Sequence, residues 1–245
     1  MSQKTIVLGK GYVGSFYCKK FPECLATSRN RDSDNTIIYF DLLNKNSWNN
    51  LPECDEVIWT FASANNEAEK NIAIEFYKFY CLNKRTVILS TTSAYIHKLD
   101  NEVIDEMTPL DLTNWRIKAE EELRILGASI VHLAGIFGPN RLPINWFVQG
   151  RVQDPDGIIN LIHVDDIVFC LHLLLEKFKK GSRYNLCNGI YKNNYKITDE
   201  LKKNKELSDK FIFPLQYSKK MNKIVSNKKL VTEILSNDYS FKSYP

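Results

Sequence analysis

Thr5-Ile6-Val7-Leu8 leads directly into Gly9-Lys10-Gly11-Tyr12-Val13-Gly14 in this 245-residue chain. A short β-branched run followed by glycines at this spacing is typical of a strand that turns sharply into a helix. The first glycine permits the turn, the second lets a phosphate approach the backbone, and the third lets the helix pack closely on the strand. The helix N-terminus then presents N–H groups and a positive dipole end. Residues 5–14 therefore predict a phosphate-binding turn; the alternative is a glycine-rich turn without a ligand.

Strand and helix patterns alternate through the first half of the chain. Helical patterns cover Tyr12–Phe21, Asn66–Leu82 and Asn114–Leu126. The strand-like runs are Thr5–Leu8, Cys24–Thr27, Thr36–Phe40, Glu56–Thr60, Thr86–Leu89 and Ser129–Leu133. Such alternation predicts an α/β fold with parallel strands covered by helices on both faces. We expect a Rossmann-type doubly wound parallel sheet, with its ligand crevice at the carboxyl ends of the strands.

The alternation loosens after about residue 135, where turn clusters rich in Gly and Pro begin. A helix is predicted from Asp166 to about Lys179, capped by Asp165 or Asp166, and a strand over Arg183–Cys187. Residues 192–245 are rich in lysine and asparagine and have an irregular pattern. We therefore expect one continuous domain, with a dinucleotide-binding core over residues 1–135. Residues 136–245 should complete the sheet and form a small irregular substrate lobe.

Composition and charge exclude several classes of protein. The net charge of +4 is nearly balanced, and no basic block is interleaved with aromatic residues, so nucleic acid is not an expected partner. The six cysteines lie far apart without metal-ligand spacing, which favours reduced thiols and no metal site. The apolar run Ile167–Leu175 is too short to span a bilayer. The strand pattern begins at Thr5 and leaves no room for a signal peptide, so we expect a soluble cytoplasmic protein.

The residues after the second strand bear on the choice of dinucleotide. An NAD site of this type usually places an Asp or Glu there to accept from the ribose hydroxyls. This chain has Ser28, Arg29 and Arg31 instead, and a guanidinium pairs well with the 2′-phosphate of NADP. We therefore expect NADP rather than NAD; alternatively, both arginines are ordinary surface charges. Asp41, after the third strand, either accepts from the adenine amino group or begins a turn.

Contacts to the cofactor are expected from Gly9, Gly11, Tyr12, Val13, Gly14, Ser28, Arg29 and Asp41. Further short motifs follow in order along nearly the whole chain: Ser90–Tyr95, Lys118–Glu120, Gly135–Pro139, Ile162–Asp166, Tyr184–Leu186 and Ser226–Leu230. With these motifs the chain resembles the extended and atypical short-chain dehydrogenase/reductases, especially their nucleotide-sugar epimerase/dehydratase-like group. The resemblance implies a nicotinamide dinucleotide as cofactor.

The resemblance also implies catalytic positions. Members of this family pair a Ser or Thr, which orients the substrate oxygen, with a Tyr-x-x-x-Lys motif. The tyrosine transfers a proton, and the lysine lowers the pKa of that tyrosine and holds the nicotinamide ribose. By register with Tyr95, the hydroxyl position falls on Thr91, with Thr92 as the neighbouring candidate, and Lys118 matches the lysine.

The tyrosine position of this motif holds Asn114. An asparagine amide has no accessible pKa and cannot transfer a proton usefully near neutral pH. Tyr95, at the crevice end of the fifth strand, is the available substitute, although an aromatic residue there more often packs beneath the cofactor or closes the turn. Lys118 either binds the ribose or is a solvated helix lysine.

Two functions follow from the resemblance. One is an NAD(P)-dependent epimerase or reductase that acts on a sugar nucleotide or a related small polyol. The other is an NADP(H)-binding redox sensor or regulatory protein without turnover. A structural subunit that has lost the ligand is disfavoured by the intact glycine turn and Arg29. A homodimer formed through the helices over Asn66–Leu82 and Asn114–Leu126 is expected from the family alone.

Overall fold

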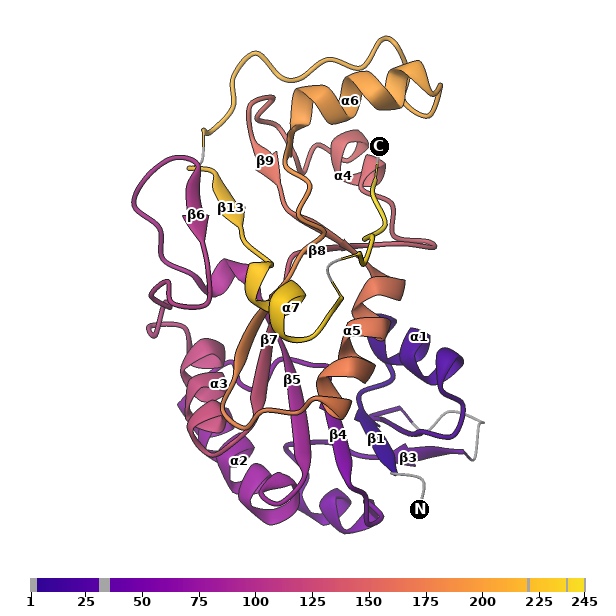
Figure 1. The fold of residues 1–245 in the computed structure, drawn as a ribbon, viewed down its shortest axis with the longest axis vertical. Helices are drawn as coiled ribbons and strands as arrows, with labels where there is room; N and C mark the ends of the chain where they lie inside the picture. The colour runs from indigo at the N-terminus through magenta and orange to yellow at the C-terminus, as the bar shows by residue number, and fades with distance from the viewer. Residues whose placement is uncertain (1–3, 31–35, 220, 237, 245) are drawn as a thin grey trace.

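The centre of the molecule is a seven-stranded parallel sheet (Figure 1). The computed structural model describes residues 4–30, 36–219, 221–236 and 238–244. The sheet has the strand order β11-β7-β5-β4-β1-β2-β3, so the order reverses direction at β1. Its strands are β1 (Thr5–Leu8), β2 (Leu25–Ser28), β3 (Ile37–Tyr39), β4 (Glu56–Trp59), β5 (Arg85–Thr91), β7 (Ser129–Leu133) and β11 (Arg183–Leu186). The predicted doubly wound sheet is thereby confirmed.

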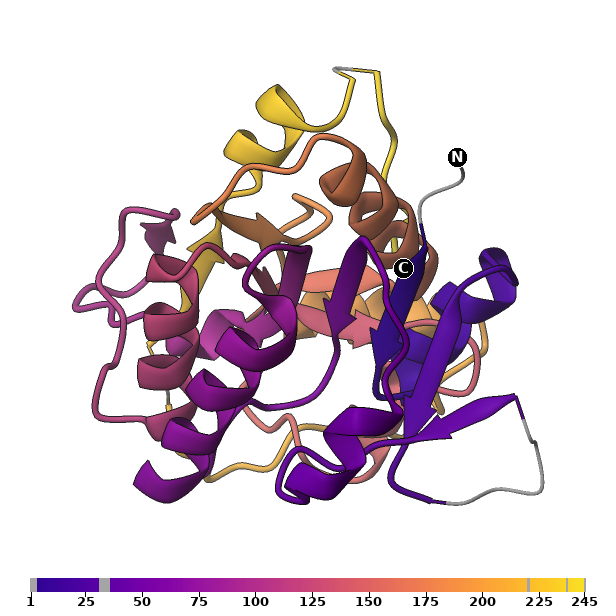
Figure 2. The same cartoon turned by 90° about the horizontal axis from the view of Figure 1, so that it is seen from below.

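Helices cover both faces of the sheet, as the view from below shows (Figure 2). On one face lie α2 (Glu67–Phe76), continued by a π-helical turn η2 (Tyr77–Cys81), and α3 (Trp115–Ile125). On the other lie α1 (Tyr12–Lys20) and α5 (Val164–Glu176). In the part of the chain described, no helix is long and apolar enough to cross a membrane.

Alternation along the strands builds a core on each face. Val7 and Ile58 pack into the apolar cluster that also contains α1 and α5 residues, whereas Ile6, Leu8 and Val57 pack with α2. Successive side chains of a strand point to opposite faces of its sheet. The buried part of a strand covered on both faces is therefore apolar without interruption, as Ile6, Val7 and Leu8 of β1 are.

The C-terminal segment is more regular than its composition suggests. The expectation of an irregular segment from residue 192 onward is wrong, because α6 (Asn194–Lys203), β13 (Lys223–Val225) and α7 (Lys228–Glu233) lie within it. Asn193 caps α6 by accepting from the N–H of Lys196 at 2.9 Å, and Ile197 and Leu201 bury its apolar side. Lysines on the exposed side of α6 conceal this narrow apolar stripe in the sequence.

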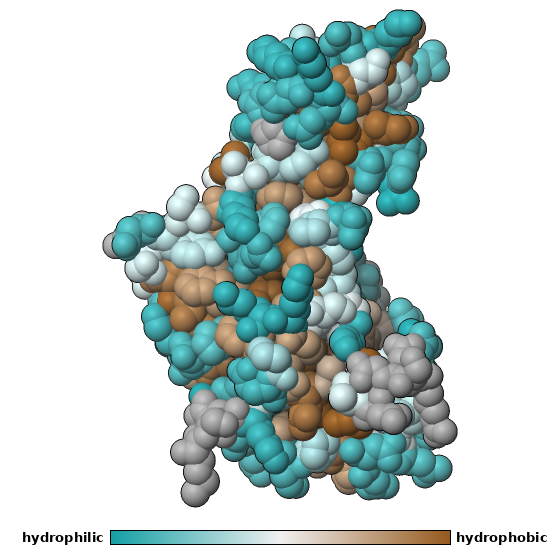
Figure 3. Space-filling view, turned by 90° about the vertical axis from the view of Figure 1, so that its right-hand side faces the viewer, coloured by the Kyte–Doolittle hydropathy of each residue, from teal (hydrophilic) through white to brown (hydrophobic). Residues whose placement is uncertain are grey.

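Short elements complete the second half of the chain. These are η1 (Lys45–Asn50), η3 (Thr92–Ala94), β6 (Glu102–Ile104), β8 (Gly135–Phe137), α4 (Ile144–Val148), β9 (Ile158–Ile159), β10 (Leu161–His163) and β12 (Lys192–Asn193). The pairs β6–β13 and β8–β10 are parallel, and β9–β12 is antiparallel. β9, α4 and α6 form a lobe above the sheet (Figure 1). The space-filling view is indented between this lobe and the body below it (Figure 3).

The start of α5 differs from the prediction. The helix begins at residue 164, and its cap is His163, whose Nδ1 accepts from the N–H of Asp165 at 3.1 Å. The prediction of an Asp165 or Asp166 cap is therefore wrong, because both aspartates lie inside the first turn. Asp166 is buried and accepts from the Tyr239 hydroxyl at 2.7 Å and from the N–H of Lys242 at 2.9 Å. The Asp166 carboxylate thus joins α5 to the C-terminal residues Tyr239 and Lys242.

His132 is a buried histidine beneath the carboxyl end of β5. Its Nδ1 lies 3.1 Å from the carbonyl oxygen of Thr91, and its ring centroid lies 4.8 Å from that of Tyr95. Because a carbonyl oxygen only accepts, Nδ1 carries the proton. Nε2 has no hydrogen-bond partner among the described residues. Burial lowers the pKa of His132 to about 3, so the imidazole is neutral in the folded protein.

We expect His132 to make the fold sensitive to acid. In the unfolded chain the imidazole is protonated below about pH 6.5, whereas in the folded protein it stays neutral down to about pH 3. The free energy of unfolding therefore falls as the pH falls from about 6.5 to about 3. Between about pH 6 and about pH 4, wild type should lose about 1.4 kcal/mol of unfolding free energy per pH unit more than His132→Asn. Urea unfolding at several pH values measures this difference. Equal slopes for the two proteins would contradict it.

Candidate functional site

The three glycines of the β1–α1 turn have different surroundings. Gly9 has φ +93°, and a Cβ there would lie 2.8 Å from the Thr60 hydroxyl oxygen. A Cβ on Gly14 would lie 2.3 Å from the carbonyl oxygen of Gly9, so only glycine lets α1 approach β1 this closely. A Cβ on Gly11 would meet nothing within 4 Å. The backbone at Gly11 therefore faces open space, which matches the position where a pyrophosphate approaches such a turn.

The N-terminus of α1 is open to an anion. The helices α2, α3, α5 and α6 begin at residues whose side chains accept a backbone N–H: Asn66, Asn114, His163 and Asn193. α1 begins at Gly11, and no side chain among the described residues caps it. Its first turn also contains no acidic residue. The first N–H groups of α1 are thus left for a ligand, and a dinucleotide pyrophosphate fits them in charge and in hydrogen bonding.

Tyr12 and Val13 contribute to the turn in different ways. Val13 is buried in the core beneath the turn. The Tyr12 hydroxyl donates to the carbonyl oxygen of Pro139 at 3.0 Å, and the Arg141 guanidinium lies 5.4 Å from the Tyr12 ring centroid. Tyr12 therefore joins the glycine turn to the loop that leads into the C-terminal lobe.

The end of β2 has hydroxyl groups and an arginine. The Thr27 hydroxyl accepts from the N–H of Gly9 at 3.0 Å, and the Ser28 hydroxyl accepts from the N–H of Asn30 at 3.1 Å. Ser28 is the last residue of β2, and Arg29, which follows directly, is exposed. Arg31 lies outside the described residues. The strand thus ends at the position that the NADP prediction requires.

Asp41 follows β3 and begins a turn. Its carboxylate accepts from the N–H of Leu43 at 3.0 Å, and its own N–H donates to the Ser47 hydroxyl at 3.0 Å. The chain then enters η1. This geometry accounts for the turn-forming alternative.

The carboxyl end of β5 carries the predicted hydroxyl and Tyr95. The Thr91 hydroxyl lies 2.9 Å from that of Ser93 and accepts from the N–H of the same residue at 3.2 Å. The Tyr95 hydroxyl donates to Asn185 Oδ1 at 2.7 Å, the side chain is buried, and burial raises its pKa above the usual range. Tyr95 therefore has the packing role that was its alternative, with its hydroxyl held inside the protein.

The start of α3 gives Asn114 a structural role. The side chain of Asn114 caps the helix by accepting from the N–H of Arg116 at 3.0 Å. Lys118 lies one turn later with its ammonium 4.9 Å from the Trp115 ring centroid. Arg116 pairs with the buried Glu120 at 2.7 Å. Asn114 thus has a structural function that a tyrosine side chain cannot perform.

Lys223 is a residue near this edge that sequence reasoning missed. Its ammonium donates to the carbonyl oxygen of Thr92 at 2.6 Å, although more than one hundred residues separate the two. Burial lowers the pKa of this half-buried amine. In the sequence Lys223 is one of many scattered lysines, and no spacing distinguishes it from those on the surface.

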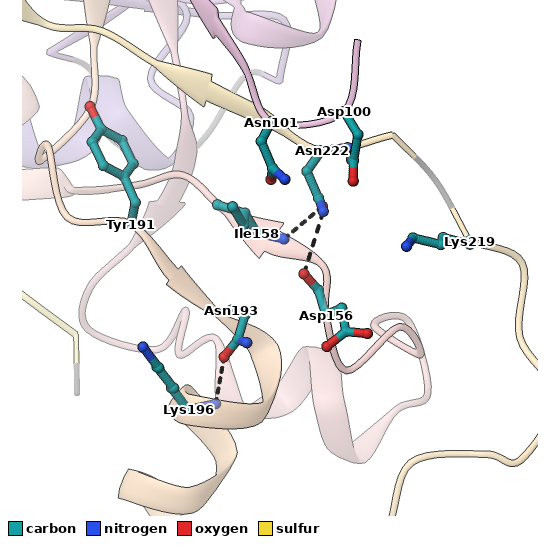
Figure 4. A pocket seen from close by; sticks show the side chains of 9 residues that line it. All are labelled: Asp100, Asn101, Asp156, Ile158, Tyr191, Asn193, Lys196, Lys219 and Asn222. Carbon is teal, nitrogen blue, oxygen red and sulfur yellow. Dashed lines mark hydrogen bonds between the residues drawn. The ribbon is translucent and has the colours of Figure 1, made fainter.

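The C-terminal lobe also contains a polar cavity of about 430 Å³ (Figure 4). Asn222 holds its walls together: its side chain accepts from the N–H of Ile158 at 2.8 Å and donates to the Asp156 carbonyl oxygen at 3.4 Å. Its backbone N–H donates to Asp100 Oδ1 at 2.7 Å. The other lining residues include Asn101, Tyr191, Asn193, Lys196 and Lys219. These groups both donate and accept hydrogen bonds, which suits a hydroxyl-rich molecule.

Comparison with other sequences gives a partial match. No protein family model matches the chain. The chain is 31% identical over 107 residues to protein YeeZ of Escherichia coli strain K12. This match covers 41% of the chain and 39% of the length of YeeZ.

Solved structures are similar to nearly the whole chain. The dTDP-glucose 4,6-dehydratase of Bacillus anthracis, in complex with NAD, has a TM-score of 0.78 and 16% identity over 99% of this chain and 92% of its own. The UDP-glucose 4-epimerase of Thermotoga maritima, with UDP-glucose, has a TM-score of 0.75 and 14% identity over 98% and 94%. RMD of Pseudomonas aeruginosa, complexed with NADPH, has a TM-score of 0.72 and 14% identity over 99% and 93%. The chain therefore has the fold of the sugar-nucleotide epimerases and dehydratases, as its motifs predicted.

Proposed function

We propose that this chain binds NADP(H) at the β1–α1 turn and acts as an epimerase or reductase on a sugar nucleotide or a related small polyol in the cytoplasm. The observation that carries the proposal is the open backbone of Gly11 at an α1 N-terminus that no described side chain caps. A pyrophosphate supplies the negative charge and the acceptors that this terminus lacks. The structural neighbours named above, in complex with NAD, NADPH or UDP-glucose, support the same classes of ligand.

The chain's own residues have distinct roles in this function. The N–H groups of α1 hold the pyrophosphate, Arg29 pairs with the 2′-phosphate, and Asp41 accepts from the adenine amino group. Lys118 leaves the Trp115 ring to bind the nicotinamide ribose. The Thr91 hydroxyl orients the substrate oxygen at the end of β5. The bound dinucleotide supplies hydride chemistry.

Arg29→Ala tests the choice of cofactor. Wild type should bind NADPH more tightly than NADH, because only NADPH presents a 2′-phosphate to the guanidinium. Loss of this charge-assisted contact should weaken NADPH binding about tenfold or more and leave NADH binding unchanged. Titration of nicotinamide fluorescence measures both affinities. Tighter binding of NADH, unaffected by Arg29→Ala, would overturn the preference for NADP.

A second function, cofactor binding without turnover, is favoured by Asn114. Asn114, at the position where the family resemblance implies the proton-transferring tyrosine, caps a helix, and the Tyr95 hydroxyl is engaged with Asn185. In this form, occupancy by NADP(H) would report the redox state of the cofactor pool to a partner. Turnover of candidate sugar nucleotides by the NADPH-loaded protein separates the two functions.

Substitutions of Asn114 test whether this residue acts only as a cap. Asn114→Asp keeps an acceptor for the N–H of Arg116 and should retain the stability of wild type. Asn114→Ala should lose about 1 kcal/mol of unfolding free energy, because the N–H loses its partner. NADPH affinity should be unchanged in both variants. A loss of affinity in Asn114→Asp, measured alongside urea unfolding, would instead indicate direct contact with the cofactor.

We further propose a homodimer through α2 and α3. These helices lie side by side on one face of the sheet (Figure 2), and three apolar side chains remain exposed at their C-terminal ends: Phe79 by 57%, Leu82 by 40% and Ile125 by 75%. Such residues favour association of two copies.

Ile125→Lys should convert the dimer to a monomer, because it places a charge within the proposed interface. Leu215→Lys is the matched control, since Leu215 is 99% exposed but lies in the C-terminal lobe. Light scattering after size exclusion measures the mass of each protein. A wild-type mass of one chain would refute the dimer.

A further inference from the structure

Lys223 has an uncommon environment for a lysine. Its backbone is held by Asn160, whose side chain donates to the carbonyl oxygen of Lys223 at 2.8 Å and accepts from the N–H of Val225 at 2.8 Å. The preceding residue, Asn222, is the one that holds the walls of the polar cavity (Figure 4). The side chain therefore starts from a rigid base and extends to the end of β5, where its ammonium donates to Thr92.

The ammonium of Lys223 has no carboxylate partner among the described residues. Glu102 is its register partner on β6, but the Glu102 carboxylate accepts instead from the N–H groups of Lys98 and Leu99, at 2.7 and 3.0 Å. Thr92 satisfies one of the three N–H donors. A cation withdrawn from water without a counter-ion lowers the stability of the folded protein. An anion that binds beside the ammonium offsets this loss of stability.

The position of the ammonium places it next to the predicted substrate site. Thr92 lies between Thr91, whose hydroxyl is expected to orient the substrate oxygen, and Ser93. Lys118, the cation that the family resemblance implies for this crevice, lies instead on the Trp115 ring. Lys223 thus brings a positive charge from the C-terminal segment to an edge of the sheet that also carries two hydroxyl groups.

We propose that Lys223 binds an oxyanion of the substrate, either a carboxylate or a phosphate, at the carboxyl end of β5. The inference rests on the proposed function for the identity of this edge as a substrate site. Thr92 accepts from one N–H of the ammonium, so two N–H donors remain for an oxyanion. The Thr91 and Ser93 hydroxyls add further donors. The substrate is accordingly an acidic or phosphorylated sugar derivative, in contrast to a neutral polyol.

Isothermal titration with inorganic phosphate and with glucuronate, at low ionic strength, tests the proposal and separates its two sources of oxyanion. Wild type should bind one of the two probes. Lys223→Met and Lys223→Gln should each weaken that binding about tenfold or more, because a charge-assisted contact is lost. Lys223→Arg keeps the charge and should retain more of the affinity than either neutral variant.

Lys229→Met is the matched control. Lys229 is also half-buried, and its ammonium also donates to a backbone carbonyl, that of Arg183 at 3.0 Å. Thermal melting of every variant identifies any loss of fold, and Lys223→Gln decides the outcome if Lys223→Met does not fold. Absence of binding of both probes to wild type overturns the proposal, as does an equal loss in Lys229→Met. NADPH titration of the same proteins is the separate test of the proposed function, so either can fail while the other stands.

Discussion

The close approach of α1 to β1 is the constraint on which the rest of the structure depends. A Cβ on Gly14 would lie 2.3 Å from the Gly9 carbonyl oxygen, a distance that no side chain tolerates. This contact determines where α1 lies on the sheet and directs its first N–H groups toward the carboxyl ends of the strands. Two threonine hydroxyls hold the turn at Gly9: that of Thr27 accepts from the Gly9 N–H, and that of Thr60 donates to the Gly9 carbonyl oxygen. The geometry of the glycine turn is therefore a consequence of how the first two elements pack.

Asparagine amides join separate segments of the second half of the chain. Asn160 bonds to the Lys223 carbonyl oxygen and the Val225 N–H, and the Asn227 side chain donates to the Cys187 carbonyl oxygen at 2.8 Å, while Asn185 accepts from Tyr95 in the first half. An amide can donate and accept at once, so one side chain satisfies two backbone groups where regular pairing ends. The richness in asparagine, which suggested an irregular segment, instead supplies the contacts that order it.

The sequence predicted the sheet well because its strands are buried on both faces. The β4 sequence has apolar residues at every position except its first. This pattern can be recognised in the sequence without knowing how the side chains pack. The short elements were not predictable in the same way. β6 and β13 consist of three residues each and pair across more than one hundred positions of the chain, so neither has a local pattern to detect. The cap of α5 was missed for a related reason, since histidine is an unusual cap and two aspartates beside it fit the common preference better.

In the candidate site, too, some residues were predictable from a local sequence pattern and others were not. The glycine turn was predictable because Gly9 and Gly14 meet local backbone requirements, whereas Lys223 reaches Thr92 only through the three-dimensional fold. The motif positions around β5 show that a family motif predicts where a residue lies more reliably than what its side chain does. Asn114 caps a helix, and Tyr95 is held by Asn185 inside the protein. The half-buried Lys223 ammonium, without a carboxylate partner among the described residues, lies instead at Thr92, directly after β5. The chain has the fold of its structural neighbours, while Asn114 and Tyr95 have capping and packing contacts in it. Under the proposed function, Lys223 adds a charge from the C-terminal segment to the Thr91 hydroxyl on the sheet, so the substrate site depends on both halves of the chain.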